Sequence, residues 1–396
     1  MSVDILLENA SVVHHDRVAQ EPLAFVAGRV AAHAPKDVFR LDLRDHLIFP
    51  GLINAHDHLQ LNNIPPLSHA QPFPNSYAWI EAFESHRRDP DVMAAVAVPM
   101  AQRLWQGGLK NLLAGVTTVA HHDPWHPVLD DPDFPVGLLR KFGWSHSLGL
   151  GVPCGGEAPR YGPDVRASFL ETPAAQPWMI HLAEGTDDVA RAELGQLDAL
   201  GCLAANTVLV HGVGLTEADV DRVIAAGASV VWCPASNFAM LGRTLDPRRL
   251  FDAGRLLLGT DSRLTGSRDL LAEFRVAAAN SDLSPGELLR IVTLDASRIL
   301  GLRESGGLHA GQNADCIIVR ADGDPQTTLL GTTRSAIRAV VRGGVPAIAD
   351  PDFDLWFSHC GVEAIPVRLD GRQKLLARPL VHPNGPVLES GLAWGH

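Results

Sequence analysis

Apolar runs of four to eight residues recur through the middle of the chain, and several of them end in a polar residue. Such runs are typical of strands that are buried on both faces, as in a parallel sheet. Packing of the core does not explain why so many of these apolar runs end in a polar residue. We therefore expect a shared site at the carboxyl ends of these strands, built from His56, His58, His181, His211 and Asp261.

Strand-like runs alternate with helical stripes between Pro50 and about residue 300, which indicates an α/β fold. The predicted strands are 48–56, 116–121, 144–150, 178–183, 208–212, 229–233 and 256–260, and the predicted helices include 91–106, 217–226, 268–280 and 285–299. The length is close to the roughly 250 residues of a TIM-like (β/α)8 barrel, so we predict one over residues 49–304. Seven strands are counted, and the short interval before Trp178 predicts a shortened fourth βα unit around residues 152–154. The alternative is a barrel that lacks one βα unit.

Both ends of the chain consist of short strand-like segments separated by turns. Residues 1–48 alternate apolar and polar positions with a turn at Gly28, and the pattern returns after residue 307. Alternation between turn residues predicts β-structure. We expect residues 1–48 and 305–396 to form one small β-sandwich domain that flanks the barrel, with a hairpin at 367–376.

The composition is that of an ordinary globular protein, with 46% hydrophobic residues and a formal net charge of -12 over 396 residues. An acidic chain without a clustered basic face argues against nucleic acid or an anionic membrane as a partner. No apolar run reaches the ~18 residues of a membrane-spanning helix. Five cysteines without a Cys-x-x-Cys pair are typical of a reducing compartment, so we expect a cytoplasmic protein. Apolar segments in the tail after residue 350 favour a homodimer.

The pair His56 and His58 has a spacing that suits metal binding. Residues two apart on a strand lie on the same face, so both imidazoles would point into the mouth of the barrel. Two neutral imidazoles are half of a zinc ligand set. A chance pair among 18 histidines is the alternative interpretation. Glu184 by itself is likewise typical of the start of a solvated helix.

Five motifs together resemble the amidohydrolase superfamily. They are Pro50-Gly51-Leu52-Ile53-Asn54-Ala55-His56-Asp57-His58, His181-Leu182-Ala183-Glu184, Leu209-Val210-His211, Cys233-Pro234-Ala235-Ser236-Asn237 and Gly259-Thr260-Asp261-Ser262. Their order and spacing match as well as their residue types. The nearest branch contains the cytosine, guanine and adenosyl-nucleoside deaminases and the s-triazine hydrolases.

The resemblance implies a metal centre. The implied ligands of one divalent metal, zinc in the first place and iron as the alternative, are His56, His58, His181 and Asp261. Such a metal lowers the pKa of a bound water to roughly 7, so that hydroxide is available at neutral pH. Binuclear relatives commonly have a bridging lysine, and no lysine occurs between residues 141 and 374. A single metal follows, with Glu157 as the alternative bridge.

The resemblance also implies which residues move protons and bind the substrate. Glu184 would take the proton of the attacking water and pass it to a ring nitrogen or leaving group. His211 would hold the water or polarise the substrate, and Asn237 would bind near it. Residues 59–90 are too long for an ordinary βα loop, and we predict a substrate lid there that includes Trp79. His122, at the end of the second predicted strand, is a further candidate for the pocket wall, with packing in the core or surface exposure as the alternative.

Three functions are compatible with this pattern. The first is hydrolytic deamination of a small nitrogen heterocycle of the purine, pterin or pyrimidine type, with release of ammonia. The second uses the same site to hydrolyse a cyclic amide or a substituted triazine. The third is an inactive barrel that serves as a binding module, which would be expected to lack one of the ligands. Because all the ligands are present, we expect a hydrolase that acts on carbon–nitrogen bonds.

Overall fold

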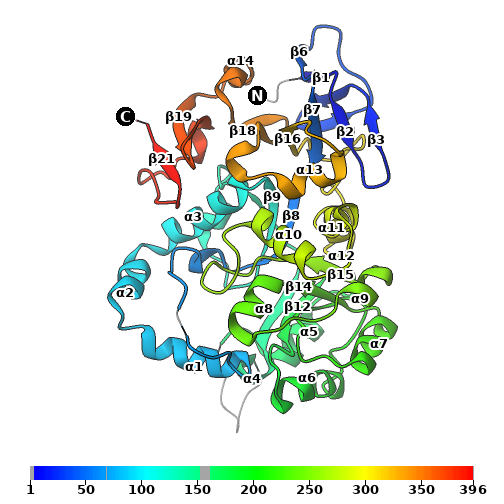
Figure 1. The fold of residues 1–396 in the computed structure, drawn as a ribbon, viewed down its shortest axis with the longest axis vertical. Helices are drawn as coiled ribbons and strands as arrows, with labels where there is room; N and C mark the ends of the chain where they lie inside the picture. Colours follow the sequence, from blue (N-terminus) through cyan, green and yellow to red (C-terminus); the bar gives the residue numbers. More distant parts are fainter. Residues whose placement is uncertain (1–3, 68, 152–160, 396) are drawn as a thin grey trace.

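Two parallel sheets form the middle of the molecule (Figure 1). The computed structural model describes residues 4–67, 69–151 and 161–395. One sheet has the order β10-β9-β8 and the other the order β11-β12-β13-β14-β15. The strands are β8 Leu52–Asp57, β9 Val116–His121, β10 Gly137–Leu138, β11 Gly143–Ser147, β12 Trp178–Leu182, β13 Thr207–His211, β14 Ser229–Trp232 and β15 Leu256–Leu258. A hydrogen bond from Asp261 N to His56 O, 3.1 Å long, links the segments that follow β15 and β8.

The predicted strands of this region are present, with two differences. The range 48–56 is divided between β7 (His46–Pro50) and β8, which belong to different sheets. An eighth parallel strand, β10, lies before 144–150 and was not predicted, so the latter range contains the fourth strand and not the third. The irregular strand that we expected around residues 152–154 lies outside the described residues.

Helices follow most of the parallel strands. They are α1 Ser76–His86, α2 Pro90–Ala97, α3 Met100–Leu113, α4 Leu148–Gly151, α5 Val165–Glu171, α6 Asp188–Ala199, α7 Glu217–Ala226, α8 Pro234–Leu241, α9 Arg248–Asp252, α10 Leu270–Ala279, α11 Pro285–Ile291 and α12 Leu294–Ile299. The predicted helix 91–106 is broken at Pro99, which lacks the N–H that a continuous helix needs. Ser284 and Glu287 form the capping box expected at the start of α11. Within the described residues, no helix is both long and apolar enough to cross a membrane.

Strands from both ends of the chain share one nine-stranded sheet, in the order β21-β19-β20-β18-β17-β16-β7-β2-β3. Within this sheet β7 from the N-terminal part pairs with β16 (Cys316–Arg320) from the C-terminal part, with Phe49 opposite Ile317. The remaining strands are β2 Ser11–Val13, β3 Val18–Gln20, β17 Ala339–Arg342, β18 Val345–Ala349, β19 Ala364–Leu369, β20 Arg372–Ala377 and β21 Leu392–Trp394. The expected hairpin at 367–376 is therefore present as β19 and β20.

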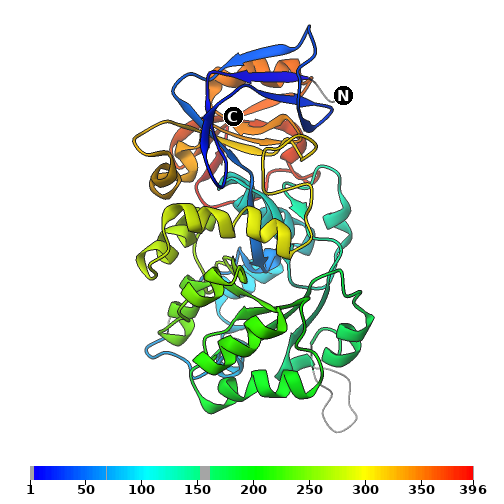
Figure 2. The same ribbon diagram turned by 90° about the vertical axis from the view of Figure 1, so that its right-hand side faces the viewer.

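A mixed sheet of four strands lies beside this sheet at the same end of the molecule (Figures 1 and 2). It has the order β5-β4-β1-β6 and contains β1 Ile5–Glu8, β4 Leu23–Val26, β5 Arg29–Ala31 and β6 Phe39–Asp42. Strand β1 is parallel to β6 and antiparallel to β4. Ala27 and Gly28, both with positive φ, make the predicted turn between β4 and β5. Two short helices, α13 Pro325–Gly331 and α14 Asp354–His359, belong to the C-terminal part. The domain limits at 1–48 and 305–396 stay a prediction.

Candidate metal centre and active site

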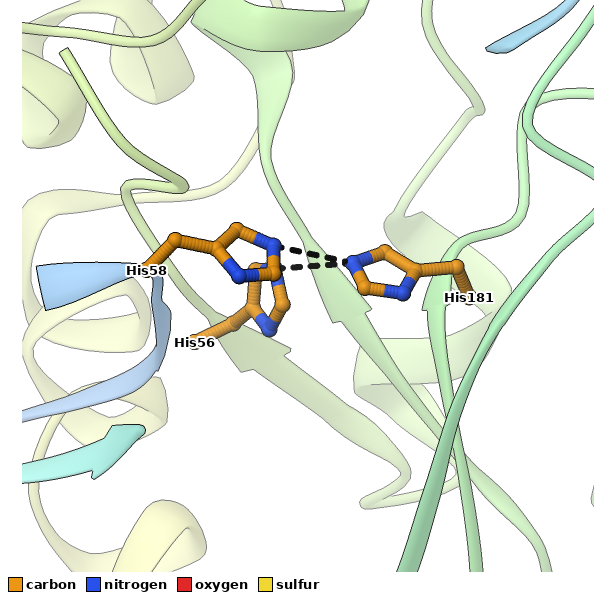
Figure 3. A group of neighbouring side chains, drawn as sticks. All are labelled: His56, His58 and His181. Carbon is orange, nitrogen blue, oxygen red and sulfur yellow. Dashed lines mark hydrogen bonds between the residues drawn. The ribbon is translucent and has the colours of Figure 1, made fainter. Parts of the chain in front are cut away.

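The end of β8 brings His56 and His58 together with His181 of β12 (Figure 3). Nε2 of His181 lies 3.2 Å from Nε2 of His58 and 3.3 Å from Nε2 of His56. All three rings are buried. Two residues of one strand and one residue of a distant strand thus point their ring nitrogens at a common point, as the two-residue spacing predicted.

The three nitrogens fit a zinc ion. Two imidazole nitrogens bound at 2.0–2.1 Å with a tetrahedral angle between them are about 3.3 Å apart, which is the spacing found here. In two of the rings the other nitrogen is hydrogen-bonded to a group outside the cluster. Nδ1 of His58 lies 2.5 Å from Asp123 Oδ2, and Nδ1 of His181 lies 2.8 Å from His146 O. Because both acceptors take an Nδ1–H, Nε2 is the atom of each ring that faces inward and is available to a metal.

Electrostatics keep two of these imidazoles in the form that binds metals. Burial lowers the pKa of His56 and His181 well below the ordinary value, and neighbouring imidazoles lower it further. Neutral imidazole is the form that coordinates a metal. His56 and His181 are therefore neutral donors at physiological pH. His58 differs: burial lowers its pKa, but the Asp123 carboxylate outweighs burial and raises it to about 9, so a bound metal would displace a proton from this ring.

Asp261 lies at the edge of this group. Its Oδ1 is 3.8 Å from Nε2 of His58 and 4.0 Å from Nε2 of His56. Its Oδ2 accepts hydrogen bonds from Ser236 Oγ at 2.7 Å and Thr265 Oγ1 at 2.8 Å. Because Oδ2 is held from outside, Oδ1 is the atom that faces the histidines.

The turn that carries Asp261 approaches β8 closely. Asp261 has a φ of 53°. A Cβ atom on Gly259 would lie 2.8 Å from Cβ of His56 and 2.9 Å from its backbone nitrogen. Only glycine allows this approach, so the glycine of the Gly259-Thr260-Asp261 motif is needed to bring the carboxylate beside the first strand.

Glu184 and His211 form a pair next to the histidine cluster. Oε1 of Glu184 lies 3.3 Å from Nε2 of His211, and Nδ1 of His211 lies 2.8 Å from Asn237 Oδ1. Ala183 and His211 have positive φ values, 52° and 76°, which turn the chain at the ends of β12 and β13. Burial raises the pKa of Glu184, with the His211 charge opposing it. A raised pKa makes this carboxylate a stronger base than an exposed glutamate, which suits a group that accepts and returns a proton.

These groups open into a cavity of about 400 Å³. Its wall includes His58, His181, Glu184, His211, Asp261, Trp79, Tyr161 and Met240. Trp79 comes from α1, which lies within the segment predicted as a lid. The neighbouring Tyr77 points elsewhere and donates to Glu193 Oε1 at 2.5 Å. The aromatic residues of this segment therefore divide between the cavity wall and packing.

Two of the predicted substrate contacts lie behind the cavity wall. His122 is fully buried, stacks on His181 with ring centroids 4.5 Å apart and bonds to Ser145 O at 3.0 Å. Asn237 is also fully buried and holds His211. Neither residue is part of the cavity wall. His122 supports the ring of His181, and Asn237 supports the ring of His211; both of these rings line the cavity. Strand alternation alone does not show which of two neighbouring residues faces the cavity.

Sequence reasoning missed the residues that support the site. Asp123 holds His58 and also accepts from Tyr161 Oη at 2.7 Å, and both Asp123 and Tyr161 line the cavity. Asp57, inside the first motif, faces away from the cavity and pairs with buried Lys110 of α3. A carboxylate between two histidines was a signal for such a partner, because alternation places it on the opposite face of the strand.

The chain has relatives of known name. Residues 157–346 match the amidohydrolase family. A 5-methylthioadenosine/S-adenosylhomocysteine deaminase of Pyrococcus furiosus is 26% identical over 78% of this chain and 83% of its own length. The corresponding deaminase of Haloarcula marismortui is 24% identical over 71% and 74% of the two chains.

Solved structures resemble the whole fold. A zinc-bound adenosine deaminase from Xanthomonas campestris has a TM-score of 0.68 at 21% identity, covering 91% of this chain and 97% of that one. An atrazine chlorohydrolase from Arthrobacter aurescens, complexed with zinc, has a TM-score of 0.69 at 19% identity, covering 90% and 99%. The resemblance inferred from the motifs is confirmed, and the chain contains an amidohydrolase family domain.

Proposed function

We propose that this protein is a metal-dependent aminohydrolase that deaminates a nitrogen heterocycle of the purine, pterin or pyrimidine type. The observation that carries the proposal is the convergence of three histidines, with Nε2 of His181 3.2–3.3 Å from Nε2 of His58 and of His56, beside the Glu184–His211 pair in one cavity. The naming of relatives as 5-methylthioadenosine/S-adenosylhomocysteine deaminases supports the same reaction.

His56, His58 and His181 would hold one divalent metal, with Asp261 as a fourth ligand through Oδ1. Zinc is the metal that fits best, because it prefers nitrogen donors and four-coordinate sites and because the nitrogen spacing suits its bond lengths. When bound, it supplies Lewis acidity that makes a water molecule acidic near neutral pH. A single metal is proposed because no lysine is among the described residues of the cavity wall, and the lysine behind the site, Lys110, is paired with Asp57. Glu157, the alternative bridge, lies outside the described residues.

The protein groups around the metal would carry the proton transfers. Glu184 accepts a proton from the attacking water and delivers it to the ring nitrogen. It then takes the second proton of that water, from the hydroxyl group now on the ring carbon, and delivers it to the amino group, so that the C–N bond breaks and ammonia leaves. His211, held by Asn237, orients the water or the substrate from the opposite side. Trp79 offers an aromatic face to the heterocycle from the α1 side of the cavity.

The arrangement around this centre is proposed as follows. The two parallel sheets form one eight-stranded barrel, which the parallel pairing and the Asp261–His56 hydrogen bond support. The sheets at the chain ends form a small β-sandwich domain beside it. A reducing, cytoplasmic location is supported by the free thiols of Cys202, Cys233, Cys316 and Cys360. A homodimer stays a prediction.

A substrate screen tests the proposal. The purified protein, with its zinc content measured, is incubated with aminated purines, pterins and pyrimidines, and ammonia release is followed. Ammonia together with the matching oxo product supports deamination. Ring opening of a cyclic amide, or loss of a triazine substituent, without turnover of any aminated heterocycle would replace deamination by the second function. Absence of all turnover by the zinc-loaded protein would contradict both.

A further inference from the structure

The segment that follows β15 has two faces with different partners. Asp261, Ser262, Leu264 and Thr265 contribute to the wall of the cavity. The side chains of Arg263 and Arg268, from the same segment, contact the C-terminal part of the chain instead. Residues 261–268 are called the cavity loop below. The contacts of Arg263 and Arg268 with the C-terminal part of the chain therefore hold this loop from the side opposite the cavity.

Arg263 forms an ion pair with the buried carboxylate of Glu389. Its Nη1 donates to Oε2 of Glu389 at 2.8 Å and its Nη2 donates to Oε1 at 2.6 Å, a bidentate pair. The Glu389 side chain is 0% exposed and that of Arg263 is 12% exposed. Arg334, 1% exposed, donates to the same Oε1 at 2.7 Å. Bidentate, charge-assisted hydrogen bonds away from water are strong and fix geometry as well as distance.

A second contact joins the same partners. Arg268 donates to Asp370, which also accepts from Arg334 Nε at 2.9 Å. Gly391, with a φ of 80°, lies against this network. A Cβ atom there would be 2.7 Å from Arg334 Nη2 and 2.8 Å from Arg268 Nη2. The C-terminal segment can approach the arginines this closely because position 391 has no side chain.

The backbone of the cavity loop is held at the same residue. Arg263 N donates to Asn62 Oδ1 at 3.0 Å, and Arg263 Nε donates to Arg268 O at 2.8 Å. With both its backbone and its guanidinium fixed, Arg263 leaves little freedom to its neighbours Ser262 and Leu264. These two residues are part of the cavity wall.

We infer that Glu389 is a positioning residue for the active site, acting through Arg263 on the cavity loop. The inference rests on the proposed function, since it gives the C-terminal segment a role in shaping that same cavity. Without the Glu389–Arg263 ion pair, the cavity loop becomes more mobile. Asp261 and the Thr265 hydroxyl that binds its carboxylate belong to this loop and move with it. Metal affinity and substrate affinity then both fall, while the sheets keep their structure.

Hydrogen exchange of the zinc-loaded full chain, followed by mass spectrometry, tests this inference. In Arg263→Gln, the Arg334–Glu389 pair remains, so the C-terminal segment stays in place while its link to the loop is lost. We expect amides of residues 262–268 to exchange about tenfold faster than in the unmodified protein, because a charge-assisted hydrogen bond is removed. Peptides from β12 and β13 should exchange unchanged. Glu389→Gln should show the same local effect.

The matched control is Glu363→Gln, since Glu363 also lies in the C-terminal part but forms an exposed pair with Arg378. This variant should leave loop exchange unchanged. Zinc affinity, measured by chelator competition, should fall about tenfold in Arg263→Gln and stay unchanged in the control.

Unchanged loop exchange in Arg263→Gln would overturn the inference, as would uniformly faster exchange throughout the chain or failure of this variant to fold. These readouts need no turnover. Absence of deaminase activity would therefore count against the proposed function alone.

Discussion

Lys110 Nζ lies 2.9 Å from Asp57 Oδ2, and both side chains are completely buried. Asn111 Nδ2 donates to the same carboxylate oxygen at 2.7 Å, and Lys110 also reaches Thr260 Oγ1 at 3.2 Å. The lysine belongs to α3, whereas its partners follow or belong to β8 and β15. One ammonium group thus joins the strand that carries His56 to the turn that carries Asp261.

Removal of Lys110 should destabilise the fold strongly. In Lys110→Met, Asp57 becomes a buried carboxylate without a cation, and breaking a buried pair in this way typically costs about 3–5 kcal/mol. We expect the free energy of unfolding, measured by urea denaturation, to fall by that amount. Lys36→Met, at an exposed position, should change it by less than about 0.5 kcal/mol. Equal stability of the two variants would contradict the assigned role.

Glu184→Gln should stop proton transfer without emptying the metal site. The amide cannot accept a proton from water, so we expect kcat to fall by about 10²- to 10⁴-fold. The three histidines remain, and the zinc content measured by elemental analysis should therefore stay the same. Glu171→Gln, exposed on α5, serves as control and should keep full activity. Wild-type turnover by Glu184→Gln would show that Glu184 does not transfer the proton, although the metal site could still be correct.

Asp123→Asn should weaken metal binding. The carboxylate lies 2.5 Å from His58 Nδ1 and orients the ring. Loss of such an outer partner typically costs about 10- to 100-fold in metal affinity. Competition with a fluorescent zinc chelator measures this change. Asp133 is an exposed loop residue, and the control variant Asp133→Asn should bind zinc as tightly as the unmodified protein. Equal zinc affinities of the two variants would show that Asp123 does not orient His58.

Glu193 should make stability depend on pH. Burial raises the pKa of this carboxyl group from 4.5 to about 7, although hydrogen bonds from Tyr77 and Ala183 N oppose the shift. The folded state therefore holds a proton that the unfolded state has lost. This contribution to stability is fully present below the unfolded pKa of 4.5 and is lost as the pH rises through about 7.

Glu193→Gln tests this dependence, because glutamine does not titrate. The free energy of unfolding of the unmodified protein should fall more between pH 5 and pH 7.5 than that of the variant. The excess slope should be at most about 1.4 kcal/mol per pH unit. Urea denaturation of the zinc-loaded proteins at both pH values measures it. Parallel pH dependence in the two proteins would show that Glu193 does not titrate in this range.

The strands that carry the site were predictable because their signal is local. An apolar run that ends in a polar residue specifies both a buried strand and the position of its carboxyl end. Period-two spacing then places His56 and His58 on one face. The capping box at Ser284 was equally local, since its two hydrogen bonds join residues three positions apart.

The elements that were missed lack such a signal. Strand β10 has two residues, too few for any periodicity, and it is defined by pairing with β9. The Lys110–Asp57 pair and the Glu389–Arg263 pair join residues far apart in sequence. An isolated lysine in a helix or a glutamate in a tail is usually solvated, so the pattern gives no reason to expect either contact. His122 and Asn237 lie behind the cavity wall, and their position in the motifs does not show which residue faces the cavity, so their contact with the substrate stays a prediction.

The pairing of β7 with β16 has a consequence for biosynthesis. Strand β7 continues directly into β8 and its metal-binding histidines, yet its neighbour in the sheet is made only after residue 315. While the ribosome is still translating the central helices, β7 has one open edge, which exposes unpaired backbone groups. A nascent chain shortened before β16 should therefore aggregate or recruit chaperones, whereas one that extends past Arg320 can close this edge.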